Sequence, residues 1–131
     1  GQSGWDWLAL QLDDGRELMI YRLRRRDGEV DPASEGVLVD AAGGKRRLER
    51  GDWTLTPVRW WRGPDGARWP IEWRLDVPAA GISGRVTPLR DDQLMPTSVR
   101  YWEGAVTLRG EVGGQGYLEL TGYEPTARSP E

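Results

Sequence analysis

The sequence predicts an all-β fold, an antiparallel, lipocalin-like up-and-down β-barrel of about eight to ten strands with almost no helix. Three observations support this prediction. Short runs of bulky residues recur at intervals of roughly 8 to 12 residues, Gly, Pro and Asp turns separate them, and several runs alternate apolar and polar residues. With 131 residues, the chain suits one core, so we expect residues 1–131 to form a single barrel domain.

The first predicted hairpin joins residues 5–12 to residues 17–23. The apolar residues of 5–12 would also share one face of a helix, so this run alone leaves helix and strand open. The Asp13-Asp14-Gly15-Arg16 segment decides between them, because an Asp-Gly pair between two bulky runs is typical of a tight hairpin turn.

Further strands are predicted at residues 36–40, 45–49, 53–61, 68–75, 81–89, 100–112 and 117–123, with a polar connection over 90–96 and a Gly-rich turn at 113–116. The clearest is 68–75, which places Trp69, Ile71, Trp73 and Leu75 on one face. Pro70, on the other face, indicates a sheet edge or a bulge. Glu72 and Arg74 share that face, and we expect them to form a surface pair of little energetic weight.

Composition limits the chemistry that the chain can perform. It contains no Cys and no His, and Lys45 is its one Lys. Ser-His-Asp triads, Cys nucleophiles, disulfides and ordinary zinc sites are therefore excluded, and we expect neither a cofactor nor a metal. The net charge of −3 argues against nucleic acid as a partner. No apolar run is long enough to predict a transmembrane segment.

The aromatic residues carry a second constraint. Eight Trp and four Tyr, with no Phe, mean that each large aromatic side chain has an N–H or O–H group that needs a hydrogen-bond partner when it is buried. The expected interior is therefore aromatic but not wholly apolar.

Two aromatic and acidic runs supply candidate functional residues. In Trp5-Asp6-Trp7 the two indoles lie on one face of a strand and Asp6 on the other, so either set can point into a cavity, but not both. In the second run, Tyr101-Trp102-Glu103-Gly104, Tyr101 and Glu103 share a face. Beside a buried phenol, a desolvated carboxyl group becomes a proton donor, whereas an outward Glu103 is simply solvated. Core packing is the simpler interpretation of the tryptophans.

Several segments, in order along the chain, resemble the carotenoid 1,2-hydratase family, also called hydroxyneurosporene synthase-like or AttH-like: residues 4–19, 21–24, 55–57, 60–70, 73–75, 101–106 and 116–123. The most specific are the first stretch, which begins GWDWLALQLDDGRELM, and YWEGAV at 101–106. The resemblance implies a bacterial protein with two lipocalin-like barrels in tandem, of which this chain corresponds to most of the second. An acidic and aromatic segment that usually precedes this stretch is absent here.

The resemblance also bears on activity. Family hydratases are expected to use an Asp shortly after a strand Tyr as the proton donor, but Arg22 and Leu23 follow Tyr21 in this chain. Hydration by that route is therefore disfavoured. Related two-barrel proteins resemble cyclases, including Diels-Alder-type enzymes, which mainly need a shaped aromatic pocket.

The leading hypothesis is a lipocalin-like domain that binds an extended apolar or terpenoid-like small molecule, with these candidate lining residues: Trp5, Trp7, Gln11, Trp73 and Trp102. An enzyme hypothesis adds an acid, Glu103 or Asp6, with Tyr21 or Tyr101 as its hydrogen-bond partner, for hydration, isomerisation or cyclisation of an alkene. A structural hypothesis has the domain pack against a second lipocalin-like barrel or a homodimer partner. A cytoplasmic, periplasmic or secreted location is equally compatible with the sequence.

Overall fold

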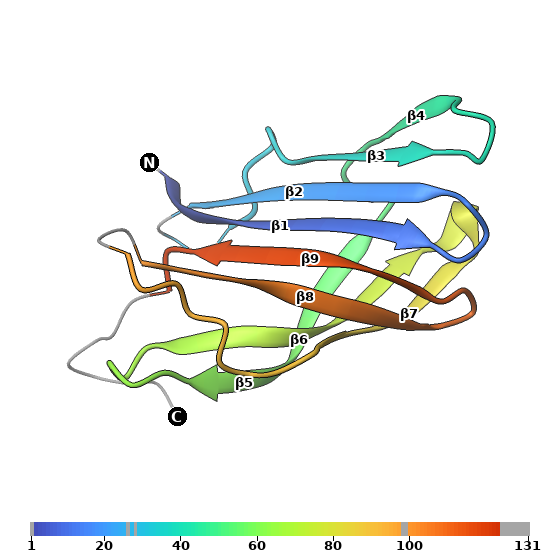
Figure 1. Ribbon diagram of the computed structural model, residues 1–131. Coiled ribbons are helices and arrows are strands. Elements are labelled where there is room, and N and C mark those ends of the chain that lie inside the picture. Colours follow the sequence, from blue (N-terminus) through green and yellow to red (C-terminus); the bar gives the residue numbers. More distant parts are fainter. Residues whose placement is uncertain (1, 26, 28, 98–99, 124–131) are drawn as a thin grey trace.

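The computed structural model describes residues 2–25, 27, 29–97 and 100–123. They form one antiparallel sheet that curls into a half-closed barrel (Figure 1). Its strands are β1 (Gln2–Leu12), β2 (Glu17–Arg25), β3 (Glu35–Val39), β4 (Lys45–Leu48), β5 (Thr54–Arg62), β6 (Arg68–Val77), β7 (Ile82–Pro88), β8 (Tyr101–Gly110) and β9 (Gly114–Thr121). A single 3₁₀ turn, η1 (Pro78–Ala80), follows β6. The all-β prediction is confirmed.

The sheet order is β4-β3-β2-β1-β9-β8-β7-β6-β5, so consecutive strands lie side by side except β4 and β5, and the first strand also pairs with the last. This is an up-and-down meander in which β1 and β9 bring the two ends of the described chain together. The two ends of the sheet are β4 and β5, which are consecutive in sequence. Within the described part of the chain no ladder joins these two strands, which is why the barrel is only half closed.

The β1–β2 hairpin forms where its turn residues predict it. The backbone N–H of Leu12 donates to the carbonyl of Arg16 at 2.8 Å, and Gly15 has φ +92°. Glycine suits that conformation because side chains with a Cβ rarely adopt positive φ. The turn sets a register in which Asp6 lies opposite Arg22 and Leu8 opposite Ile20.

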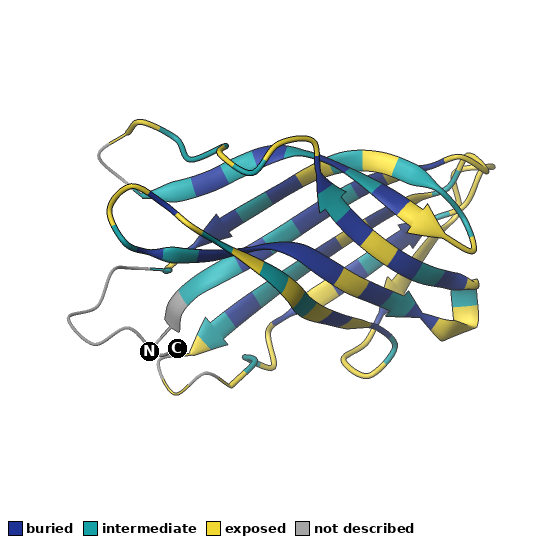
Figure 2. Ribbon diagram, turned by 90° about the horizontal axis from the view of Figure 1, so that it is seen from below, coloured by how far each residue is buried: buried dark blue, intermediate teal, exposed yellow. Residues whose placement is uncertain are grey.

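The interior is a packed core. Burial alternates along the strands, as Figure 2 shows, and the inward residues of β1, β6 and β8 are almost fully shielded from solvent. The largest are Trp69, Trp73 and Trp102, each 0% exposed. The indole N–H of Trp73 donates to the carbonyl of Pro70 at 2.7 Å and that of Trp102 to the carbonyl of Asp91 at 2.8 Å. The expectation that buried aromatic residues find polar partners is met at these two positions but is wrong at Trp53 and Trp69, whose buried indole N–H groups have no hydrogen-bond partner among the described residues.

Strand β6 confirms the face predicted from its alternation and corrects one detail. Pro70 pairs with Trp60 beside a register irregularity in β5, and the ladder to β7 begins only at Trp73, so the local edge expected at Pro70 is present. The expected Glu72–Arg74 surface pair is wrong. Glu72 is buried and accepts hydrogen bonds from Arg59 at 2.8 Å and Arg85 at 3.2 Å.

The actual partner of Arg74 is Asp76, at 3.1 Å. Asp76 lies two residues further along β6, so two-residue alternation places it on the same face as Arg74. Alternation within β6 could not identify the cross-strand partners of Glu72, and the β5 register that sets Arg59 opposite Glu72 includes irregularities at residues 57–60 that the sequence does not mark clearly.

Truncation of a core indole tests the packed interior. We expect Trp73→Ala to lower the free energy of unfolding by about 3–5 kcal/mol, because it removes a fully buried side chain and leaves a cavity. Trp60→Ala is the matched control, since Trp60 is 43% exposed, and it should cost about 1 kcal/mol or less. Urea unfolding followed by circular dichroism measures both, and equal losses would contradict a filled interior.

Candidate functional site

The structure divides the predicted site residues between the two faces of the sheet. Three point into the barrel: Asp6, Trp73 and Trp102. The others lie on the outer face, where they are partly or fully exposed: Trp5, Trp7, Gln11, Tyr21, Tyr101 and Glu103. At Trp5-Asp6-Trp7, therefore, the carboxylate is inside and the indoles are outside. No single pocket combines all nine residues.

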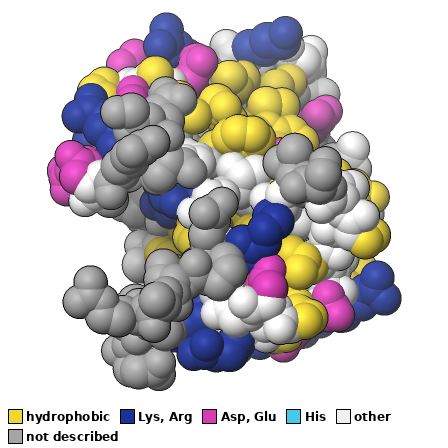
Figure 3. Space-filling model, turned by 90° about the vertical axis from the view of Figure 1, so that its left-hand side faces the viewer, with side chains coloured by type: hydrophobic (Ala, Val, Ile, Leu, Met, Phe, Trp, Pro, Cys, Tyr) yellow, Lys and Arg dark blue, Asp and Glu magenta, His cyan; other side chains and the backbone are white. Residues whose placement is uncertain are grey.

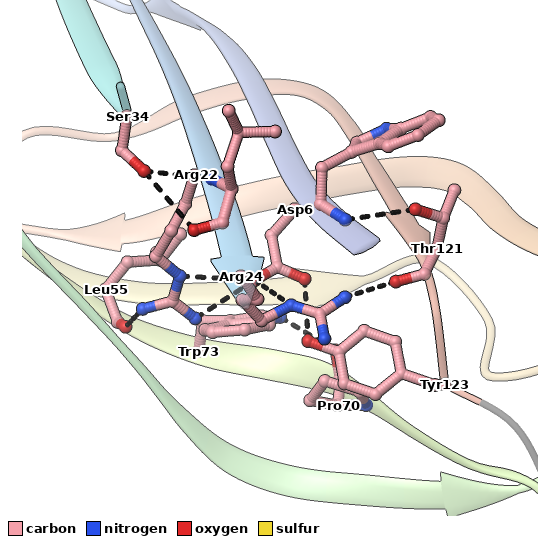
Figure 4. Close-up of polar contacts among 11 residues, drawn as sticks. Asp6, Arg22, Arg24, Ser34, Leu55, Pro70, Trp73, Thr121 and Tyr123 are labelled. Carbon is pink, nitrogen blue, oxygen red and sulfur yellow. Dashed lines mark hydrogen bonds and ion pairs between the residues drawn. The ribbon is translucent and has the colours of Figure 1, made fainter. Parts of the chain in front are cut away.

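Asp6 is the centre of a buried polar cluster at one end of the barrel (Figure 4). Its side chain is fully buried, and its Oδ2 accepts hydrogen bonds from Nε of Arg22 and Nε of Arg24, both at 3.1 Å. Its Oδ1 accepts a hydrogen bond from the hydroxyl of Tyr123 at 2.6 Å. Both carboxylate oxygens are therefore engaged by groups of the protein itself.

The two arginines extend this cluster to neighbouring elements. Arg22 also donates to the carbonyl of Leu55 on β5 at 2.6 Å, and its guanidinium lies 5.0 Å from the ring centroid of Trp73 on β6. Arg24 donates to the carbonyl of Thr121 and lies 4.0 Å from the ring centroid of Tyr123. The cluster ties β1 and β2 to β5, β6 and the end of β9. Two guanidinium groups and one carboxylate leave it with one net positive charge.

Tyr123 seals the same end of the barrel. Its ring packs edge-on against Trp60, with centroids 6.1 Å apart, and lies 5.7 Å from the ring of Trp69. Burial, together with the nearby Asp6 carboxylate, raises the pKa of the Tyr123 hydroxyl well above its usual value, so the hydroxyl stays protonated and donates to Asp6. Figure 3 views the molecule from this end, where charged and hydrophobic side chains lie close together on the surface.

On the outer face, the predicted aromatic and acidic residues form a cross-strand row. Tyr21 lies opposite Trp7, Trp7 opposite Glu119, and Glu119 opposite Glu103. The indole of Trp5 donates to Oε2 of Glu119 at 2.9 Å. Among the described residues, the phenol bonded to Asp6 is that of Tyr123; neither Tyr21 nor Tyr101 fills the role expected for it, and Glu103 lies outside the core.

A groove of about 800 Å³ runs across the same outer face, from Lys45 at the start of β4 over β3, β2, β1, β9 and β8; the strands β2, β1, β9 and β8 lie side by side in Figure 1. One side of it is an apolar row made by consecutive cross-strand neighbours: Val37, Met19, Ala9, Tyr117, Ala105 and Leu89. Met19, Tyr117 and Leu89 are exposed. Of the residues predicted from sequence, only Gln11 lines this groove.

Sequence reasoning missed Arg22, Arg24 and Tyr123 as partners of Asp6. Arg22 could have been predicted from the hairpin turn. A hairpin that turns at residues 13–15 pairs residues whose numbers sum to 28, and this rule sets Asp6 opposite Arg22. The position of Tyr123 depends on the β1–β9 ladder, which closes over more than a hundred residues of sequence and has no local signal.

The described residues contain no group of three or more His, Cys, Asp or Glu side chains placed to hold a metal ion. None of them forms a helix long and apolar enough to cross a membrane.

The meander, the packed interior and the closing β1–β9 pair define a lipocalin-like up-and-down β domain. The chain belongs to the AttH-like family, whose model matches residues 1–123. The crystal structure of an AttH candidate protein from Nitrosomonas europaea is similar, with 35% identity and a TM-score of 0.84. The match covers 94% of this chain but 39% of that protein. No curated protein matches the sequence.

Removal of the buried charge tests the role of Asp6 as the anchor of the cluster. We expect Asp6→Asn to lower the free energy of unfolding by about 3 kcal/mol, because two largely buried guanidinium groups lose their shared counter-ion. Asp76→Asn is the control, since it breaks an Asp–Arg pair on the exposed surface and should change stability little. Comparable losses in the two variants, measured by urea unfolding, would show that the Asp6 cluster does not hold the barrel end together.

The Tyr123 hydroxyl should make stability fall at alkaline pH. Its pKa is raised in the folded state, so its contribution is complete below the unfolded pKa of about 10 and declines as pH rises beyond it, by up to about 1.4 kcal/mol per pH unit. Tyr123→Phe should be less stable than wild type at pH 8 and show a shallower decline between pH 9 and 11. Parallel pH profiles of unfolding free energy would contradict this assignment.

Proposed function

We propose that this domain binds an extended, largely apolar or terpenoid-like small molecule in the groove on its outer face. The observation that carries this proposal is the groove itself. Its volume of about 800 Å³ falls within the range typical of ligand sites, and its apolar row leaves Met19 and Tyr117 exposed. Exposed apolar residues that adjoin one another on a sheet are characteristic of binding surfaces.

The interior offers less support for the same function. A lipocalin-like barrel holds a ligand inside only when its core leaves room, and here Trp69, Trp73 and Trp102 are fully buried within a continuous apolar cluster. Of the predicted lining residues, Trp73 and Trp102 therefore act as core. Gln11 lines the groove, and Trp7 lies in the next outer row.

Acid catalysis has weaker support than binding. Both oxygens of Asp6 accept hydrogen bonds from Arg22, Arg24 and Tyr123, which leaves no oxygen directed at a substrate. Glu103 lies on the outer face beside Glu119, in a row next to the groove rather than in an apolar enclosure. A cyclase that works by holding a reactive conformer needs only the groove and stays compatible with the proposal.

A matched pair of charge insertions tests the groove. Met19 is 46% exposed within it and Val58 is 43% exposed on β5, outside it. We expect diphenylhexatriene, an apolar polyene whose fluorescence rises on binding, to bind wild type saturably. Met19→Lys should weaken that binding at least about tenfold, because it places a charge against the apolar row. Val58→Lys should leave the affinity unchanged.

Fluorescence titration gives the dissociation constants, with circular dichroism to check that both variants fold. The proposal fails if wild type shows no saturable binding, or if the two lysine variants lose affinity equally.

A second candidate function is packing against another domain. The chain spans only 39% of the similar Nitrosomonas europaea protein, so most of that relative lies outside the matched region, and the apolar row gives an exposed surface against which a further domain could pack. On this hypothesis the isolated chain should self-associate through the same face. Sedimentation velocity should then show a dimer that Met19→Lys dissociates and Val58→Lys does not, whereas a monomer at all concentrations would count against it.

A further inference from the structure

The groove has two chemically different sides. A second row of cross-strand neighbours runs parallel to the apolar row, two residues away from it on each shared strand. This polar row consists of Lys45, Glu17, Gln11, Gln115 and Thr107, with Val39 between Lys45 and Glu17. All of them line the groove. A ligand lying across the strands would therefore meet hydrocarbon along one edge and hydrogen-bonding groups along the other.

The side chains of the polar row are uncommitted. Within the described part of the chain, none of the five makes a side-chain hydrogen bond or an ion pair. Two acidic residues elsewhere on the outer face do have partners: Glu72 binds Arg59 and Arg85, and Asp76 binds Arg74 and Ser83. The groove is thus lined by hydrogen-bonding groups that the fold does not use.

The order of charges along the row indicates what these groups can bind. One half of the row consists of two amides and a hydroxyl, Gln11, Gln115 and Thr107, which are consecutive cross-strand neighbours on β1, β9 and β8. Amide and hydroxyl groups both donate and accept hydrogen bonds, so they pair with neutral hydroxyl or carbonyl oxygens. Lys45 and Glu17 carry opposite charges at the same end, so that end favours neither an anion nor a cation.

Strand spacing sets the distance between the binding positions. Neighbouring strands lie about 4.8 Å apart. The side chains of Gln11, Gln115 and Thr107 therefore span roughly 10 Å along a ligand that crosses β1, β9 and β8. We propose that the groove selects a neutral, extended hydrocarbon molecule with hydroxyl or carbonyl oxygens along one edge, held by Gln11, Gln115 and Thr107. This inference rests on the proposed function, because it names the ligand class of the same groove.

Competition against diphenylhexatriene tests the ligand class. The competitors are dodecane-1,5-diol, dodecan-1-ol and dodecanoate, which share one chain length and differ in their oxygens. We expect the diol to displace the probe from wild type at about fivefold lower concentration than the mono-alcohol, since it makes one more hydrogen bond. Dodecanoate should gain no advantage from its charge, because Glu17 offsets Lys45.

Two variants assign the effect to the polar row. Gln115→Leu and Thr107→Val should each remove the advantage of the diol, measured within each variant as the ratio of the mono-alcohol and diol concentrations that displace half of the probe, so that any change in affinity for diphenylhexatriene cancels. Thr56→Val, at an exposed position on β5 outside the groove, is the matched control and should preserve the advantage.

The outcomes separate this inference from the proposed function. If diphenylhexatriene binds and Met19→Lys weakens it, but diol and mono-alcohol compete equally, the groove is a binding site and the ligand class is wrong. Tighter competition by dodecanoate that is lost in Lys45→Gln would also overturn the class, in favour of an anionic ligand. Absence of any saturable probe binding would reject both proposals.

Discussion

The alternation of side chains along β1 is the constraint on which the other features of this domain depend. Successive residues of a strand point to opposite faces of the sheet, and β1 pairs on both sides, with β2 and with β9. Leu8, Leu10 and Leu12 enter the core with Asp6, which sends Trp5, Trp7 and Gln11 outward. A one-residue slip would exchange the two sets, so one register places both the buried charge and the groove.

The buried charge makes that register costly to change. Asp6 shares its carboxylate with two arginines from β2 and the hydroxyl of Tyr123, and a buried carboxylate without partners is strongly unfavourable. A shifted β1 would leave Arg22 and Arg24 without their counter-ion. The cluster therefore favours one strand register over the alternatives. It joins β1 and β2 to β5 and β6 at one end of the barrel, while the large indoles fill the rest of the interior. The proposed binding site is therefore on the outer face.

Local patterns in the sequence predicted the fold and the inner face of β6, because hairpin turns and two-residue alternation are short-range signals. They placed Asp6 and the Trp5 and Trp7 indoles on opposite faces without showing which face was the core. The missing information was long-range. Tyr123 reaches Asp6 only through the β1–β9 ladder, and the groove joins residues from six strands, none of which forms a motif alone.

If ligands meet the outer face while the interior stays packed, the two methionines of the chain should report it directly. Met19 lines the groove and Met95 does not. With ¹³C-methyl methionine and ¹⁵N-indole labels, titration with diphenylhexatriene should shift the Met19 methyl resonance and leave Met95 and the indole signals of Trp69, Trp73 and Trp102 in place. Shifts of those three indoles with an unchanged Met19 would locate the ligand inside the barrel and contradict the account.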